Sequence, residues 1–339
     1  MNLQAVFCPY EGCVDKGVVG KGNVVWWQQG RKRCKCQSCE RTFSYRRGTM
    51  FYGLRTEEAV VIQVVTLLAY GCPCQAIVAA FRLDERTVMA WQQRAGVHAQ
   101  AVHEAHIQPL DLQQVQADEL RIKLQSQVVL WVAMAIMVST RLWLGAVVSE
   151  QRDSHLISNL AVLVRRWAQK VAVYITFDGF AAYRDAFERA FSDKGRGLWG
   201  RTVNCVWPCL TLAQVVKHKA NGSFQIARYV LRGSCTMLAR LCRATQLDGT
   251  INTAFIERLN GTFRAYLAPL VRRTHGLART QQTVTCAVFW LGCVYNFCRV
   301  HTTLKHTTPA MAAKLTDHVW TVSELLWYRP KCCSHSSTV

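Results

Sequence analysis

The segment Val171–Gly179, VAVYITFDG, contains the clearest strand in the sequence and ends beside an acidic residue. Its first seven residues are apolar or β-branched without interruption, which is typical of a strand buried on both faces of a parallel sheet. Asp178 follows at the carboxyl end of this strand, where open α/β sheets place their binding sites. The segment therefore predicts an α/β domain with an acidic site at the end of a central strand.

A second strand with an unusual carboxylate lies upstream, in Val115–Leu124 (VQADELRIKL). Because side chains alternate between the two faces of a strand, Asp118 shares the apolar face with Leu120 and Ile122, while Glu119 lies on the opposite face. A carboxylate on an apolar face costs several kcal/mol unless it is paired or bound to a metal. Asp118 is therefore a candidate site residue.

Further elements complete the predicted α/β domain. The apolar runs 128–138 and 141–148 predict two more strands, which with 115–124 form an antiparallel meander. Helices are predicted over 153–169 and 180–191, on either side of the central strand. We therefore expect a mixed sheet covered by helices.

A third acidic candidate, Glu257, stands in a strongly basic region. Residues 196–300 hold 14 Lys and Arg but only two acidic residues. In the helix predicted for 251–267, Glu257 lies opposite an apolar stripe formed by Phe255, Leu259 and Phe263. On this helix alone, a solvated glutamate or a partner for Arg264 is the alternative interpretation.

Taken together, these three carboxylates match the needs of a divalent-cation site. Hard ions such as Mg²⁺ or Mn²⁺ prefer oxygen ligands, and carboxylates offset their charge. Two such ions can activate a water and stabilise the leaving oxygen in phosphodiester cleavage. The sequence therefore predicts that Asp118, Asp178 and Glu257 are metal ligands and catalytic residues.

The overall charge indicates a polyanionic partner. The 339 residues include 41 Lys and Arg against 21 Asp and Glu, a net charge of +20. Most of the excess lies in residues 1–55, with 10 basic and 3 acidic residues, and in 196–300. Long basic stretches with few acids suit a surface that follows phosphates, so we expect double-stranded DNA as partner.

Composition also bears on the cellular compartment. The longest apolar runs, such as 128–138, are shorter than the roughly 18–20 residues of a membrane span. The first residues, MNLQAVFCPYEGC, lack the apolar segment of a secretory signal. Sixteen cysteines without an evident pairing pattern favour free thiols in a reducing cytoplasm. We therefore expect a cytoplasmic protein that does not bind membranes.

Four of these cysteines have metal-ligand spacing. Cys8 and Cys13 form one pair, and Cys36 and Cys39 form a second pair 22 residues further on. Two cysteine pairs separated by such a loop are typical of a structural Zn²⁺ site, which supplies the folding energy of a short segment. Cys34 is an alternative ligand to Cys36, because it lies only two residues earlier.

Three short helices follow the cysteine-rich segment. They are predicted over 56–70, 74–81 and 85–94, with Thr56 as the first N-cap and Gly71 and Gly96 as helix ends. Helix, short turn and helix, with polar and basic residues on the last one, is a helix-turn-helix pattern. A plain three-helix bundle is the alternative. The side chains expected to contact DNA are Arg86, Thr87, Gln92 and Arg94.

A basic hairpin is predicted around 205–235, inserted between the last core strand and the Glu257 helix. Asn221-Gly222 provides its turn between two alternating segments. A structural β-extension with solvated charges is the alternative to a DNA-contacting hairpin. The candidate DNA contacts here and on the following helix are Lys217, Lys219, Arg228, Arg232 and Arg264.

Several of these segments resemble one family. CPYEGC with CQSCERTF, then ADEL, TFDGF and above all NTAFIERLNGTFR, resemble insertion-sequence transposases of the insertion sequence one group, as does the segment from YNFCRVHTT to about Trp327. The resemblance implies a DDE-type transposase with an RNase H-like core, whose acidic residues fall on Asp118, Asp178 and Glu257. The sequence departs from the pattern in its Cys8–Cys13 spacing and in the long interval between Asp178 and Glu257.

The resemblance implies an α/β protein in four parts. These are a zinc ribbon (1–50), a helix-turn-helix domain (51–105), an RNase H-like mixed-sheet catalytic core (111–300) and a C-terminal tail (301–339). The expected activity is binding of terminal inverted repeats, cleavage of 3′ ends and joining to target DNA, by a homo-oligomer associated with a prokaryotic nucleoid. The alternatives are a zinc and helix-turn-helix regulator with an inactive core, and an RNase H-like nuclease without strand transfer.

Overall fold

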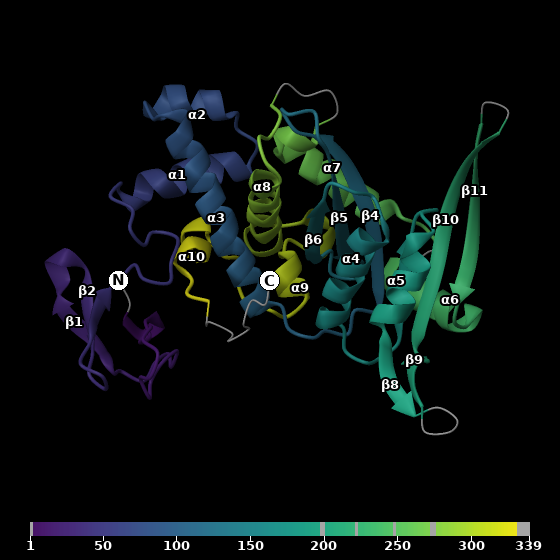
Figure 1. Cartoon of the computed structure of the whole chain (residues 1–339), viewed down its shortest axis with the longest axis horizontal. Coiled ribbons are helices and arrows are strands. Elements are labelled where there is room, and N and C mark those ends of the chain that lie inside the picture. The colour runs from purple at the N-terminus through teal and green to yellow at the C-terminus, as the bar shows by residue number, and fades with distance from the viewer. Residues whose placement is uncertain (1–2, 197–200, 221–222, 247–248, 272–275, 331–339) are drawn as a thin grey trace.

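A six-stranded sheet, a set of N-terminal helices and a small cysteine-rich ribbon make up the chain (Figure 1). The computed structural model describes residues 3–196, 201–220, 223–246, 249–271 and 276–330, without the side chains of residues 219, 220, 223 and 224. No helix in these ranges has the length and apolar character needed to cross a membrane.

The large sheet is mixed, as predicted. Its order is β11-β10-β7-β4-β5-β6. The strands β4, β5 and β6 form the antiparallel meander, while β7 pairs in parallel with both β4 and β10. The strand bounds are β4 Gln114–Lys123, β5 Val129–Met137, β6 Trp143–Ser149, β7 Val173–Phe177, β10 Leu210–Ala220 and β11 Ser223–Arg232. The expectation of an α/β fold with a mixed sheet is therefore confirmed.

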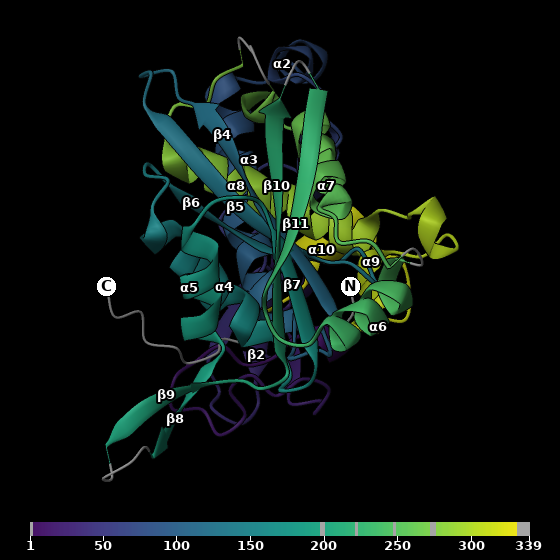
Figure 2. The same cartoon turned by 90° about the vertical axis from the view of Figure 1, so that its right-hand side faces the viewer.

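Helices cover both faces of this sheet (Figure 2). On one face lie α4 (Ser154–Trp167) and α5 (Ala182–Ala190), packed on a core that includes Ile175 and Phe177. On the other face lie α7 (Ala254–Tyr266) and α8 (Gln281–Cys293), packed on alternate residues of β4 such as Leu120. The helix α6 (Cys235–Gln246) packs on Tyr174 from this same side. All five residues of β7 are buried, which explains its uninterrupted apolar sequence.

The basic hairpin is built differently from the expected insertion. Its first strand, β10, pairs in parallel with β7 from Leu210 to Gln214 and is therefore itself a strand of the large sheet. The predicted turn Asn221-Gly222 and the side chain of Lys219 lie outside the described residues. A separate hairpin, β8 (Ser192–Arg196) with β9 (Thr202–Val206), projects from the body and was not predicted (Figure 2).

The three predicted N-terminal helices are present, but the third is much longer than expected. The helices are α1 (Glu58–Ala69), α2 (Cys74–Phe81) and α3 (Glu85–His106). The N-cap position of helix α1 is Glu57 and not Thr56, and the Glu57 side chain makes no capping hydrogen bond. Helix α3 continues through Gly96, and a Cβ at this position would lie 2.2 Å from the carbonyl oxygen of Cys286. This glycine thus permits close approach of α3 and α8 and does not end the helix.

The described C-terminal residues pack on these helices. One apolar cluster joins α1, α2 and α3 to the end of α8 and to α10 (Val322–Trp327), with members such as Val65, Trp91, Trp290 and Leu325. Helix α8 is followed by a π-helical turn, Val294–Cys298, and by the short α9, Pro309–Ala312. Short 3-10 turns occur at Leu3–Ala5, Gln29–Arg31, Ala268–Leu270 and Thr302–Leu304.

The cysteine-rich segment is a three-stranded antiparallel ribbon. Its strands are β1 (Val24–Gln28), β2 (Arg33–Cys36) and β3 (Thr42–Ser44). The C-terminal segment ties it to the helices, since Trp327 contacts the rings of both Tyr45 and Phe51. Arg329 donates hydrogen bonds to the carbonyl oxygens of Tyr45 and Arg47.

Candidate functional site

Asp118 and Asp178 lie side by side because their strands pair in parallel. The register of β4 and β7 aligns Gln116 with Thr176, so two further residues bring Asp118 next to Asp178. One carboxylate oxygen from each, together with one from Glu119, lies within 4.8 Å of the others. We call Asp118, Asp178 and the nearby Glu257 the acidic centre.

The environment of Asp118 disfavours a bare negative charge. Asn260 on α7 donates a hydrogen bond of 2.7 Å to Asp118 Oδ2 and is itself buried. Burial and the neighbouring charges of Glu119, Asp178 and Glu257 raise the pKa of Asp118 to about 7. A bound cation would stabilise the ionised form of Asp118 and lower this pKa, because an opposite charge favours the ionised carboxylate.

Glu257 belongs to the same region but lies apart from the two aspartates. It occupies the first turn of α7, with its side chain 47% exposed. Its Oε1 accepts hydrogen bonds from Lys217 Nζ (2.6 Å) and Thr253 Oγ1 (2.8 Å). Burial raises the pKa of Glu257, but these two bonds outweigh it and leave the pKa below its ordinary value. Its oxygens are not among those grouped with Asp118 and Asp178.

Two residues of this region, Glu119 and Arg152, were not predicted as site residues. Glu119 is buried, and its oxygens accept hydrogen bonds from Arg152 and from Tyr183 Oη (2.7 Å). Arg152 also reaches Asp178 Oδ2 at 3.3 Å. Strand alternation placed Glu119 on the face opposite Asp118, where no local pattern marks it as buried, and nothing local identifies Arg152 as its partner.

The acidic centre fits a divalent cation by its donor chemistry. Asp118 and Asp178 offer oxygen ligands at short range, which is what Mg²⁺ and Mn²⁺ require. The side chain of Asp178 is 39% exposed, so a cation can reach it from solvent. A divalent ion could therefore be held here, with Glu257 as a further ligand if its bond to Lys217 opens.

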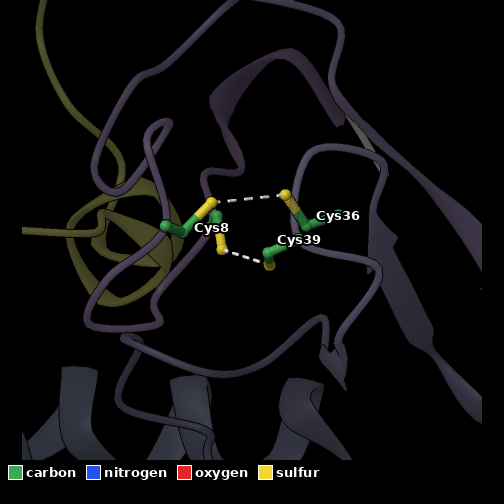
Figure 3. Close-up of side chains that lie close together, drawn as sticks. Cys8, Cys36 and Cys39 are labelled. Atoms are coloured by element: carbon green, nitrogen blue, oxygen red, sulfur yellow. Dashed lines mark hydrogen bonds between the residues drawn. The ribbon is translucent and has the colours of Figure 1, made fainter.

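The second candidate metal site is the group of Cys8, Cys13, Cys36 and Cys39. Figure 3 shows Cys8, Cys36 and Cys39 turned toward one another. The Sγ atoms of all four lie within 4.8 Å, with Cys8–Cys39 at 3.6 Å and Cys13–Cys36 at 3.8 Å. Zn–S bonds of about 2.3 Å in a tetrahedron place sulfurs about 3.8 Å apart. The four thiols therefore have the separations that a tetrahedral ion requires.

Cys36, and not Cys34, belongs to this group. Cys34 is buried in the ribbon core on β2, and its thiol is not among the four that gather. Burial raises the pKa of Cys36, but backbone N–H groups of Cys39 and Ser38 outweigh it and bring the pKa to about 7. Such backbone donors favour the thiolate, which is the form that binds metals.

The predicted DNA contacts on α3 have different environments. Arg86 is exposed in the first turn, while Thr87 and Gln92 are partly buried. Arg94 donates hydrogen bonds to the carbonyl oxygens of Met50 and Tyr52, so it anchors the segment that precedes α1. Of these four predicted contacts, Arg86 is the one whose side chain is exposed and not engaged as Arg94 is.

The basic residues predicted near the hairpin are partly engaged within the chain. Arg228 donates a 2.8 Å hydrogen bond to the carbonyl oxygen of Ile251, and Arg232 lies 3.7 Å from Glu188. Lys217 is paired with Glu257, and Arg264 lies in the last turn of α7. These positions do not share one face of the sheet, since Arg232 lies near α5 on one face while Lys217 pairs with α7 on the other.

A scan against protein-family models finds no match, and a search of curated proteins finds no matching sequence.

Proposed function

We propose that this chain is a DDE-type DNA transposase related to the insertion sequence one group. It would bind the terminal inverted repeats of its element, cleave their 3′ ends by metal-assisted hydrolysis and join them to target DNA. The observation that carries the proposal is the arrangement of Asp118 and Asp178 on adjacent parallel strands, with Glu257 on the helix that covers the same region.

The topology supports an RNase H-like core for this chain. Such cores contain a three-stranded antiparallel meander followed by parallel strands on the other side of the first strand. The order β6-β5-β4-β7-β10 has this arrangement, with helices on both faces. Asp178 then stands at the carboxyl end of β7, where open α/β sheets place their binding sites, with Asp118 beside it on β4.

In this proposal Asp118, Asp178 and Glu257 hold Mg²⁺ or Mn²⁺. When bound, the ions would activate a water and stabilise the leaving oxygen of the phosphodiester. Asn260 keeps the carboxylate of Asp118 in place through its 2.7 Å hydrogen bond. Glu257 becomes available as a ligand when Lys217 leaves it, which would free a positive charge for the DNA backbone.

The N-terminal parts are proposed to recognise DNA. Zn²⁺ held by the four cysteines would stabilise the ribbon, and α2 with α3 would form a helix-turn-helix with the exposed Arg86 in the first turn of α3. Since transposition brings two element ends together, the chain would act as a dimer or larger oligomer on DNA. Its net charge of +20 favours association with this polyanion.

The test is incubation of the full chain with Mg²⁺ and linear duplexes that carry the DNA flanking its gene. Strand cleavage and joining are measured separately, the second with a pre-cut 3′-OH end. The variants Asp118→Asn, Asp178→Asn and Glu257→Gln should each lose cleavage by orders of magnitude while duplex binding without metal persists.

The same assay separates the proposal from its alternatives. Cleavage without joining would indicate a nuclease, and specific binding without metal-dependent cleavage would indicate a regulator with an inactive core. Arg189→Gln, a charge change on the exposed surface of α5, is the control and should cut as the unaltered chain does. Near-normal cleavage by a folded Asp178→Asn variant would show that the acidic centre is not the catalytic site.

A further inference from the structure

Arg152 extends from the loop between β6 and α4 to the edge of the acidic centre. Its guanidinium contacts Glu119 through Nε and Nη2, and Nη2 also lies 3.3 Å from Asp178 Oδ2. The guanidinium carbon lies 5.1 Å from the ring centroid of Trp131 and 4.4 Å from that of Phe180. Two aromatic rings and a carboxylate therefore hold this cation in position.

Both carboxylate oxygens of Glu119 are engaged within the chain, although one also lies within 4.8 Å of oxygens of Asp118 and Asp178. Its side chain is only 1% exposed, and its second oxygen accepts the hydrogen bond from Tyr183 Oη. Tyr183 is fully buried and stacks on Phe177, with centroids 4.8 Å apart and an interplanar angle of 8°. Burying a carboxylate in this way is costly, and Arg152 and Tyr183 each offset part of the cost.

Part of the Arg152 guanidinium remains available to a ligand. The side chain is 34% exposed, beside an Asp178 side chain that is 39% exposed. Within the described part of the chain, Nη1 makes no hydrogen bond. A flat guanidinium with free N–H donors matches the oxygens of a phosphate group, and it presents them at the one place where DNA would otherwise meet several carboxylates.

We propose that Arg152 binds a phosphodiester group of DNA at the acidic centre, and that Glu119 and Tyr183 are the positioning residues that hold it there. This inference rests on the proposed function, because it assumes that DNA enters the acidic centre. It assigns Glu119 to the arginine and leaves Asp118, Asp178 and Glu257 as the metal ligands.

The experiment measures binding of the full chain to a duplex of about 40 base pairs with a 3′-OH end, in EDTA, over a series of salt concentrations. Arg152→Gln should weaken binding roughly 10-fold, as expected for loss of a charged hydrogen bond, and should lower the salt slope by about 1. Arg152→Lys should keep the slope but recover only part of the affinity, since it keeps the charge and loses the planar fork. Arg189→Gln is the matched control.

Glu119→Gln distinguishes the two roles of the buried carboxylate. If Glu119 positions Arg152, the variant should weaken duplex binding in EDTA a few-fold and leave Mn²⁺ affinity, measured by titration calorimetry without DNA, nearly unchanged. If Glu119 is a metal ligand, Mn²⁺ affinity should fall while binding in EDTA is unaffected, and this result would overturn the assignment.

A further variant controls for misfolding caused by loss of the ion pair between Arg152 and Glu119. Because Arg152→Gln leaves Glu119 buried without its cation, the double variant Glu119→Gln with Arg152→Gln removes both charges and should fold if the single variant does not. If either variant folds and binds the duplex with unaltered affinity and salt slope, the inference about Arg152 is wrong. That result would not contradict the proposed function. If the unaltered chain neither binds duplexes nor cuts them, both this inference and the proposed function fail.

Discussion

Lys217 on β10 donates a 2.6 Å hydrogen bond to Glu257 on α7, joining a predicted DNA contact to a predicted metal ligand. The two residues are 40 positions apart, and both side chains are about half exposed. In this arrangement the lysine ammonium neutralises the carboxylate that a cation would otherwise bind. Metal binding and release of Lys217 toward DNA are therefore expected to be coupled.

This coupling predicts that Lys217→Met changes metal binding but not duplex binding in EDTA. Mn²⁺ binding without DNA should tighten by up to about 5-fold, because an exposed ion pair worth at most about 1 kcal/mol no longer competes. Duplex binding in EDTA should change little, since Lys217 is then occupied by Glu257. Isothermal titration calorimetry measures the first effect, and filter binding measures the second. Weaker Mn²⁺ binding in the folded variant would contradict the prediction.

The group of four cysteines predicts that replacing Cys36 and replacing Cys34 have different effects on zinc binding. Cys36→Ser should lose the bound zinc, expected at about one ion per chain, and make residues 1–50 sensitive to protease. Cys34→Ser should keep the zinc, because Cys34 lies outside the group of four. Metal content by mass spectrometry and limited proteolysis check both. Equal zinc loss in the two variants would show that the ligand set is different.

The close approach of α3 and α8 predicts a strong effect of Gly96→Ala on stability. A Cβ at this position would meet the Cys286 carbonyl oxygen at 2.2 Å, so the helices must separate, at a cost of about 1–3 kcal/mol or more. Gly261→Ala is the control, since nothing lies within 4 Å of a Cβ there and alanine favours the helix by roughly 0.5–1 kcal/mol. Urea unfolding curves should therefore shift in opposite directions.

The burial of His98 predicts that the folded chain loses stability in mild acid. Burial lowers its pKa from 6.5 to about 4, although its Nε2 lies 3.1 Å from the carbonyl oxygen of Leu325. Between these pH values the unfolded chain binds a proton that the folded chain does not, so the free energy of unfolding falls as pH falls from 6.5 to 4. His98→Gln should reduce that fall by on the order of 3 kcal/mol.

The measurement is chemical unfolding at several pH values between 4 and 7. His155→Gln, on the exposed surface of α4, is the control and should follow the unaltered chain. His103 is also buried with its pKa lowered to about 4, so part of the pH dependence should remain in His98→Gln. A pH profile of His98→Gln identical to that of the unaltered chain would exclude His98 as a source of the effect.

The sequence by itself determined the features that depend on neighbours along the chain. An uninterrupted apolar run predicted the buried strand β7, alternation predicted the face of Asp118 on β4, and cysteine spacing predicted the group completed by Cys36 and Cys39. These patterns are reliable because strand alternation and metal-ligand spacing are local geometric constraints.

Only the tertiary structure decided how distant segments meet. It made β10 a strand of the large sheet, carried α3 through Gly96 against α8, and brought Arg152 to Glu119 across 33 residues. It also left Glu257 bound to Lys217, apart from the two aspartates. A glycine, a charged residue or a hairpin has the same local pattern whether it faces solvent or another element. The difference depends on which surfaces the packed core brings into contact.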